Sequence, residues 1–155
     1  MSIPQFSTLS KEDSDLLFQA PALVTCLIAG AEDKFNVEEE EQSKHLVRIR
    51  ANSGDPILID YYKEVEKTFE AQLNALVSKY GNLQAEPRIE ILVKELSKLN
   101  DILPKIDSIF VRPYVKSLRT LAHAIAESSG GILGFLSVSY EEKHLIGLEM
   151  ISFEA

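Results

Sequence analysis

The sequence has few of the features that would place it outside the cell or in a membrane. It contains one cysteine, Cys26, so no disulfide can form within the chain. The residues before Ser7 do not show the basic segment and apolar segment of a secretory signal. The longest uncharged apolar run, 20–31, has 12 residues, whereas roughly 20 are needed to cross a bilayer. We therefore expect a cytoplasmic protein without membrane insertion, and we interpret 20–31 as a buried helix.

Basic residues are also scarce relative to acidic ones. The chain has 16 Lys and Arg against 24 Asp and Glu, which gives a net charge of −8. An acidic surface repels the phosphate backbone that supplies most nucleic-acid affinity, so no nucleic-acid partner is expected. The apolar share of 45% and the charged share of 26% are ordinary for a globular protein. The length of 155 residues predicts one domain, 1–155, with a sizeable core.

The pattern of apolar residues indicates helices. They recur at intervals of three and four through most of the chain, and the alternation typical of strands is almost absent. Ser10 with Asp13, and Asn36 with Glu39, form patterns typical of helix N-termini. We predict an all-α fold, a compact single-domain bundle of about six to seven helices. The expected helices cover approximately residues 10–31, 36–51, 58–80, 87–103, 111–128 and 139–151.

Three prolines lie inside or between these expected helices. A proline in a helix removes one backbone donor and clashes with the preceding turn. Pro21 therefore predicts either a kink near residues 19–20 or two helices that meet there. Pro104 and Pro113 predict a bent or segmented helical region between Leu99 and Val115.

Two segments of the chain look alike, 22–49 and 121–150. Each has a helix rich in small residues, then a loop, then a capping pattern and a second helix containing Lys-His-Leu, at 44–46 and at 143–145. We interpret them as a helix-loop-helix pseudo-repeat. The two small-residue helices should then lie side by side at the centre, where small side chains let helix backbones approach closely. The small residues concerned are Ala29, Gly30, Ala122 and Ala126.

The first of these segments resembles the tellurite-resistance TerB-like family. The matching stretch is 28–39, Ile-Ala-Gly-Ala-Glu-Asp-Lys-Phe-Asn-Val-Glu-Glu, and 125–131 is similar to the end of the family's second helix. The resemblance implies a compact all-helical bundle. The family is linked with divalent-cation binding through acidic residues at these helix ends, and Glu32 and Glu39 fall on such positions. The family's Asp-Gly is replaced by Glu32-Asp33, so this loop has lost its glycine.

Acidic residues cluster in the segment 31–41, and the pattern leaves two interpretations open. It can be a solvated helix start, since acidic side chains favour the positive end of the helix dipole. It can also hold a divalent cation, although Phe35 and Val37 would occupy ligand positions of an EF-hand loop. A less regular cation site would need oxygen ligands from the loops of both similar segments, 22–49 and 121–150. Its candidate ligands are Glu32, Asp33, Glu38, Glu127 and Glu142.

Other motifs give weaker indications of chemistry. Cys26 and the three histidines, His45, His123 and His144, lack the spacing of a zinc site. The apolar neighbours of Cys26 raise a thiol pKa, so we expect a buried structural residue. His123 is expected to be half-buried, without a partner acid.

The loop after residue 128 carries two further motifs. Its glycines, Gly130, Gly131 and Gly134, follow a helix and precede no Lys-Ser or Lys-Thr, so they predict a turn and not a phosphate loop. Phe135 and Leu136 either fold back onto the core or form an exposed contact patch.

These observations favour a noncatalytic helical module that binds another protein, associates with itself or acts in a stress-response assembly. We assign no catalytic, cofactor or metal residues. Two alternatives stay open: a divalent-metal-binding protein that uses the acidic loop, and an enzyme with a pocket between helices.

Overall fold

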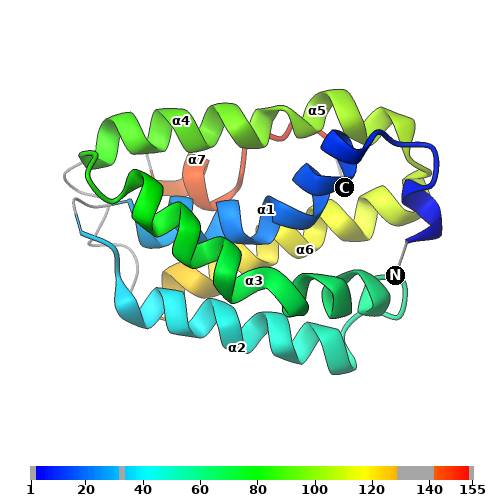
Figure 1. Cartoon of the computed structure of the whole chain (residues 1–155), viewed down its shortest axis with the longest axis horizontal. Coiled ribbons are helices and arrows are strands. Elements are labelled where there is room, and N and C mark those ends of the chain that lie inside the picture. The colour runs from blue at the N-terminus through cyan, green and yellow to red at the C-terminus, as the bar shows by residue number, and fades with distance from the viewer. Residues whose placement is uncertain (1–2, 32–33, 129–141, 154–155) are drawn as a thin grey trace.

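The computed structural model describes residues 3–31, 34–128 and 142–153, and within these ranges it is all-helical (Figure 1), which confirms the predicted fold class. None of the helices described is long and apolar enough to span a membrane. In chain order the elements are η1 (Pro4–Phe6), α1 (Lys11–Ala29), α2 (Val37–Ser53), α3 (Ile59–Tyr80), α4 (Ala85–Ser97), α5 (Leu99–Ile102), η2 (Leu103–Lys105), α6 (Ser108–Glu127) and α7 (Glu142–Ile146).

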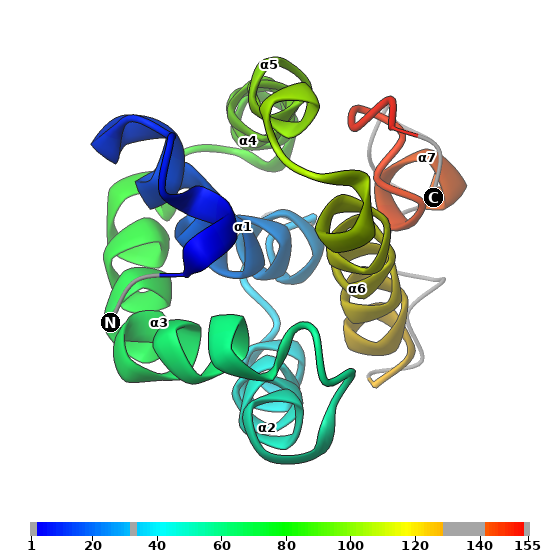
Figure 2. The same cartoon turned by 90° about the vertical axis from the view of Figure 1, so that its right-hand side faces the viewer.

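Helix α1 lies at the centre of the bundle. Figure 2 shows it surrounded by α3, α2, α6 and the α4–α5 pair, and it contacts all of them. Every residue from Ala20 to Ala31 is buried, because this stretch is apolar around its whole circumference and is covered on all sides. The predicted burial of 20–31 is thus confirmed, and the helix itself ends at Ala29.

The predicted N-caps begin two of these helices. The Ser10 side chain accepts a hydrogen bond from the Asp13 amide at the start of α1, and the Asn36 side chain accepts one from the Glu39 amide at the start of α2. Such bonds satisfy backbone donors that have no partner within the helix. Helix boundaries predicted from caps therefore agree with the structure at both positions.

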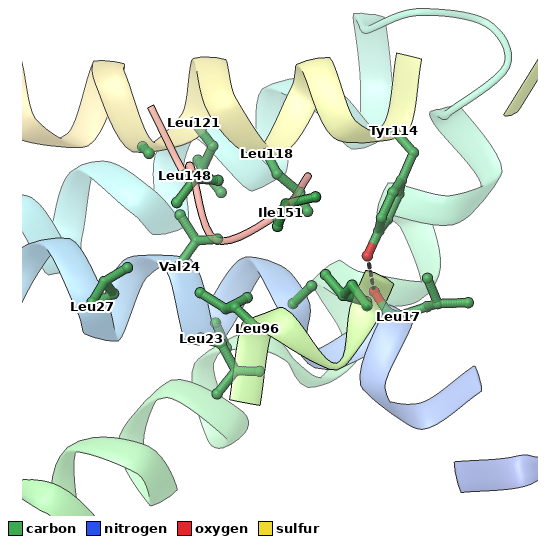
Figure 3. Close-up of a cluster of buried hydrophobic side chains, with 14 of the residues drawn as sticks. Leu17, Leu23, Val24, Leu27, Leu96, Tyr114, Leu118, Leu121, Leu148 and Ile151 are labelled. Carbon is green, nitrogen blue, oxygen red and sulfur yellow. Dashed lines mark hydrogen bonds between the residues drawn. The ribbon is translucent and has the colours of Figure 1, made fainter. Parts of the chain in front are cut away.

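Pro21 lies within α1, and α1 is one helix from Lys11 to Ala29 rather than two that meet. Proline lacks an N–H, so the carbonyl of Leu17 loses its donor within the helix. Two tyrosine hydroxyls replace that donor: Tyr61 donates to the Leu17 carbonyl at 2.5 Å and Tyr114 at 3.0 Å. Figure 3 shows the Tyr114 bond beside the core formed by α1, α6 and the C-terminal residues. Tyrosines of α3 and α6 thus supply the hydrogen-bond donors that the Leu17 carbonyl lacks within α1.

The region from α4 to α6 is segmented, as the sequence predicts. Pro104 lies in η2, and the chain bends there between α5 and α6. The expectation that Pro113 also interrupts the helix is wrong, because Pro113 lies inside α6. The carbonyl that it leaves without a helical donor belongs to Ile109, which is 67% exposed and can be hydrated by solvent.

The C-terminal helix is shorter than expected. Leu145, Leu148 and Ile151 are buried as predicted, but α7 ends at Ile146. Leu148 has a φ of 48°, its amide donates to the Leu145 carbonyl, and the Glu149 amide donates to the His144 carbonyl. These two bonds define a Schellman motif with Leu148 in the left-handed position that glycine usually occupies. The motif turns the chain so that the residues after it cover α1 and α6.

Helices α1 and α6 lie side by side and end at the same end of the molecule (Figures 1 and 2), as the pseudo-repeat predicts. Ala29, Ala122 and Ala126 are buried. The expected role of Gly30 in this contact is wrong, because a Cβ at Gly30 would meet Phe35 and Arg88. The second helices of the two units of the pseudo-repeat differ in length, since α2 has 17 residues and α7 has five.

Candidate functional site

A cavity of about 280 Å³, lined by both polar and apolar groups, lies where the end of α2, the start of α3 and the middle of α6 meet. Its wall includes Arg50 from α2, Tyr62 from α3, and Lys116, Ser117 and Thr120 from α6. Gly54, Asp55, Leu58 and Pro113 complete the lining. Six polar side chains, including that of Asp55, thus line one space, so this cavity is the strongest candidate site among the described residues.

Arg50 is fixed at the cavity by three hydrogen bonds. Its Nη1 donates to the Tyr62 hydroxyl at 3.1 Å and to the Ser117 carbonyl at 2.6 Å, and its Nη2 donates to the Thr120 hydroxyl at 2.9 Å. The guanidinium also lies 5.5 Å from the centroid of the Tyr62 ring, within the range of a cation–π contact. All its acceptors are neutral oxygens, so its positive charge is not compensated by them.

The hydroxyl groups of Tyr62 and Ser117 continue the hydrogen bonds of Arg50, and each of them donates to the next acceptor. The Ser117 hydroxyl donates to the Tyr114 carbonyl at 2.8 Å, which uses its only proton. The Tyr62 hydroxyl, 2.8 Å from the Ser117 oxygen, must therefore donate to it and accept from Arg50. Tyr62 and Ser117 are both buried. These hydrogen bonds thus hold the guanidinium in one orientation, and among the described residues no base is hydrogen-bonded to the Ser117 hydroxyl.

The cavity carries more positive than negative charge. Arg50 and Lys116 contribute two cations and Asp55 one carboxylate, so the formal charge is 2 − 1 = +1. In the described part of the chain, neither Arg50 nor Lys116 forms an ion pair within 4.0 Å. One oxygen of Asp55 accepts a bond from the Ile57 amide at 3.0 Å. A locally cationic cavity stands out on a protein with a net charge of −8.

A second cationic side chain, Arg88, is fully buried near the end of α1. It donates from Nε and Nη2 to the Gly30 carbonyl, at 3.1 and 2.7 Å, and from Nη1 to the Leu83 carbonyl at 2.7 Å. Its guanidinium lies 4.5 Å from the centroid of the Phe35 ring. A cation at the carboxyl end of a helix also interacts favourably with the helix dipole. These contacts give Arg88 a structural role in joining α1, the α3–α4 turn and Phe35.

The residues that the sequence proposes for a metal are only partly described. Glu32 and Asp33, and the side chain of Glu142, lie outside the described residues. Glu38 is exposed, and the Glu127 carboxylate lies 3.3 Å from His123 Nδ1. Within the part of the chain that the structure describes, no three His, Cys, Asp or Glu side chains form a group that could hold a metal.

The other candidates from the sequence behave as follows. His123 is exposed and has Glu127 as a partner acid, so the expectation of a half-buried histidine without one is wrong. His123 lies on the exposed face of α6, away from the buried residues of that helix. His45 is exposed, and Nδ1 of His144 lies 2.7 Å from the Glu149 carboxylate. Gly130, Gly131, Gly134, Phe135 and Leu136 lie outside the described residues.

Cys26 is fully buried, as predicted. Burial raises the pKa of its thiol from 9.0 to about 12, and the nearby Arg88 charge lowers it by less. A thiol with such a pKa is protonated at neutral pH and is a poor nucleophile. The predicted burial of Cys26 is confirmed, and the raised pKa of its thiol supports the interpretation of a structural residue.

A second cleft, of about 440 Å³, lies between the start of α1 and the α4–α5 region. It is mainly acidic, and three of its carboxylates are paired: Asp13 with Lys105 at 3.1 Å, Glu95 with Lys98 at 3.0 Å and Asp15 with Lys11 at 2.8 Å. Its remaining carboxylates are Glu12 and Asp101. Because lysines neutralise part of this cleft, it has a mixed surface and no convergent set of ligands.

The sequence reasoning missed Arg50 and its partners, although one signal pointed to them. Ser43, Val47 and Ala51 form the buried face of α2, and Arg50 follows Val47 by three positions. A charged residue on an apolar helical face is a candidate for a buried contact. The acceptors could not be found in this way, because Ser117 and Thr120 lie 67 and 70 positions away.

Comparisons with protein-family models, with curated proteins and with solved structures return no match for this chain. The geometry of the cavity is therefore the basis for the functional proposal.

Proposed function

We propose that the chain is a noncatalytic helical module that binds another protein, with the α2–α3–α6 cavity as its docking point. The proposal places it in the cytoplasm, since its one cysteine is kept as a buried thiol. It also includes the likeness to the TerB-like family carried by residues 28–39.

The observation that carries the proposal is the composition of the cavity. It contains fixed hydrogen-bond donors and uncompensated positive charge, which are binding groups. Catalysis by Ser117 would need a base beside its hydroxyl, and that hydroxyl instead donates to the Tyr114 carbonyl. The cavity thus supports recognition of a partner better than a reaction.

The experiment compares two double variants in the host cell. One removes the cavity cations, Arg50→Gln with Lys116→Gln, and the other removes two exposed cations elsewhere, Arg48→Gln with Lys67→Gln. Both change the net charge equally. Arg48 and Lys67 have 67% and 62% exposed side chains, so their removal leaves the cavity intact.

Crosslinking followed by affinity purification should recover a stoichiometric partner with the wild type and with the control variant, and recover much less with the cavity variant. Equal recovery with all three proteins would show that the cavity is not the docking point. Turnover of a hydrolase substrate panel that is abolished by Ser117→Ala would contradict the noncatalytic proposal.

A further inference from the structure

We propose that the α2–α3–α6 cavity binds a carboxylate group, held between the Arg50 guanidinium and the Lys116 ammonium. This inference deepens the proposed function and partly rests on it, because it names the chemical group that the partner presents.

The first support is that Arg50 has N–H groups without an acceptor among the described residues. A guanidinium has five N–H groups, and three hydrogen bonds, all to neutral oxygens, hold Arg50 at the cavity wall. In the described part of the chain its Nε has no acceptor.

The second support is that Arg50 is held in place before any ligand arrives. Its bonds join α2 to Tyr62 of α3 and to Ser117 and Thr120 of α6, and Tyr62 and Ser117 are themselves buried and bonded. A fixed guanidinium loses little side-chain entropy when it binds an anion, and its planar N–H groups match a carboxylate. An anion that binds the remaining N–H groups therefore requires no rearrangement of the bundle.

The third support concerns which anion fits. Arg50 and Lys116 supply two positive charges and Asp55 supplies one negative charge in the same lining. A net charge of +1 matches a carboxylate, which carries one negative charge. A phosphate near neutral pH carries up to two, so Asp55 would repel it more strongly. The volume of about 280 Å³ suits a single acidic group or side chain and is below the usual range for larger ligands.

The acidic cleft at α1, α4 and α5 does not compete with this proposal. It is a group of carboxylates partly neutralised by Lys98 and Lys105, and nothing in it points to a ligand. In the α2–α3–α6 cavity, by contrast, a polar network and an uncompensated charge converge on one space.

The test titrates the isotopically labelled protein with sodium acetate at constant ionic strength, followed by NMR of the Thr120 amide and the Arg50 side-chain Nε–H. We expect saturable shifts at both, with inorganic phosphate binding more weakly than acetate. Shifts that remain linear in acetate concentration would refute the proposal. Phosphate that binds more tightly than acetate would refute the choice of a carboxylate.

Variants of the cavity give the sharper test. Arg50→Gln should abolish saturable binding. Lys116→Gln should weaken it about 3-fold and Asp55→Asn should strengthen it about 3-fold, the size of one partly exposed charge interaction. Asp55→Asn keeps an oxygen for the Ile57 amide, so the turn is preserved. Unchanged affinity in both Lys116→Gln and Asp55→Asn would overturn the proposal.

Controls separate folding from binding. Arg48→Gln removes an arginine from the same helix and should leave acetate affinity unchanged. Lys116 and Asp55 are exposed, so their variants test the cavity even if Arg50→Gln unfolds the chain. Circular dichroism melting of each variant identifies such an unfolding.

The source of the carboxylate is distinguished with two short peptides. One carries an internal glutamate between blocked ends, and the other has a free C-terminus and no acidic side chain. Tighter binding of the first identifies a side chain, and tighter binding of the second identifies a C-terminus. If acetate binds but no partner is recovered from cells, the proposed function fails and the carboxylate site stands. If a partner is recovered but acetate does not bind, the carboxylate site fails and the proposed function stands.

Discussion

The Leu17 carbonyl shows how single residues far apart in the sequence maintain a helix with an internal proline. Pro21 leaves that carbonyl without a donor inside α1, and the hydroxyls of Tyr61 and Tyr114 both donate to it. A buried carbonyl with no hydrogen bond costs about 1–3 kcal/mol. The two tyrosine hydroxyls therefore stabilise α1 by replacing the backbone donor that Pro21 lacks.

This dependence predicts a non-additive result. Tyr61→Phe and Tyr114→Phe should each lower the free energy of unfolding by about 1 kcal/mol, and the double variant should lose more than the sum, since the carbonyl then has no donor. Pro21→Ala restores an N–H and should reduce the cost of the double variant. The measurement is urea denaturation of the full cycle.

Tyr80→Phe is the matched control for this cycle, because no hydrogen bond of the Tyr80 hydroxyl occurs among the described residues, and it should be nearly neutral. Additive losses that are the same with proline or alanine at position 21 would refute the assigned role of the two hydroxyls.

Cys26 and the same two tyrosines predict how stability depends on pH. Burial raises the pKa of the Cys26 thiol to about 12 from 9.0, and raises the pKa of Tyr61 and Tyr114 above 10.0. A folded-state pKa above the unfolded value means that the stability is fully present below the unfolded pKa and is lost as the pH rises through the folded one. The free energy of unfolding should thus fall from pH 9 upward.

Urea midpoints measured between pH 7 and pH 11 check this expectation. Cys26→Ala should flatten the decline that begins near pH 9, and leave the part that begins near pH 10, which belongs to the tyrosines. A decline of the same slope in Cys26→Ala and in the wild type would exclude a contribution from the thiol.

At the scale of helices, the contact between α1 and α6 depends on small side chains. Ala126 is 2% exposed on α6, whereas Ala71 is exposed on α3. Ala126→Leu should overpack its site and cost about 1–3 kcal/mol, and Ala71→Leu should be nearly neutral. Equal urea midpoints for the two variants would contradict the packing of α6 described above.

The end of α7 gives a second test at this scale. Leu148 adopts a left-handed conformation that costs a non-glycine residue roughly 1 kcal/mol, and its buried side chain offsets that cost. Leu148→Ala loses the side chain and keeps the strain, whereas Leu148→Gly loses both. Both variants should be less stable than the wild type, with the glycine variant about 1 kcal/mol more stable than the alanine variant. The opposite order in thermal or urea unfolding would refute the strain at this position.

The helices themselves could be predicted because their signals are local. Caps such as Ser10 and Asn36, and apolar residues three and four positions apart, act within one or two turns. The continuity of α1 through Pro21 could not, since its hydrogen-bond donors come from residues 44 and 97 positions away. The same limit applies to the cavity, where Arg50 meets α6 only once the bundle is packed. The early end of α7 depends on the left-handed Leu148, which no propensity predicts.

For the whole molecule, the central position of α1 predicts one cooperative unit. α1 contacts α2, α3, α4, α5, α6 and α7, so its amides can exchange only when these contacts separate together. Native-state hydrogen exchange of Leu23, Val24 and Leu27 should therefore report the same free energy as global urea unfolding. Amides near the Schellman motif at residues 147–149 serve as the comparison and should exchange through smaller openings. Exchange of α1 at a free energy well below the global value would contradict a single unit.

The two tyrosine bonds to Leu17 also bear on the order in which the chain acquires its structure during synthesis. α1 leaves the ribosome before α6, but the second hydroxyl that donates to its Leu17 carbonyl belongs to Tyr114 of α6. Nascent chains that end before α6 present α1 with an apolar circumference that α6 does not yet cover. Such intermediates expose surface that chaperones bind and that promotes aggregation. The hydrogen bonds of native α1 are thus complete only after α6 has been translated.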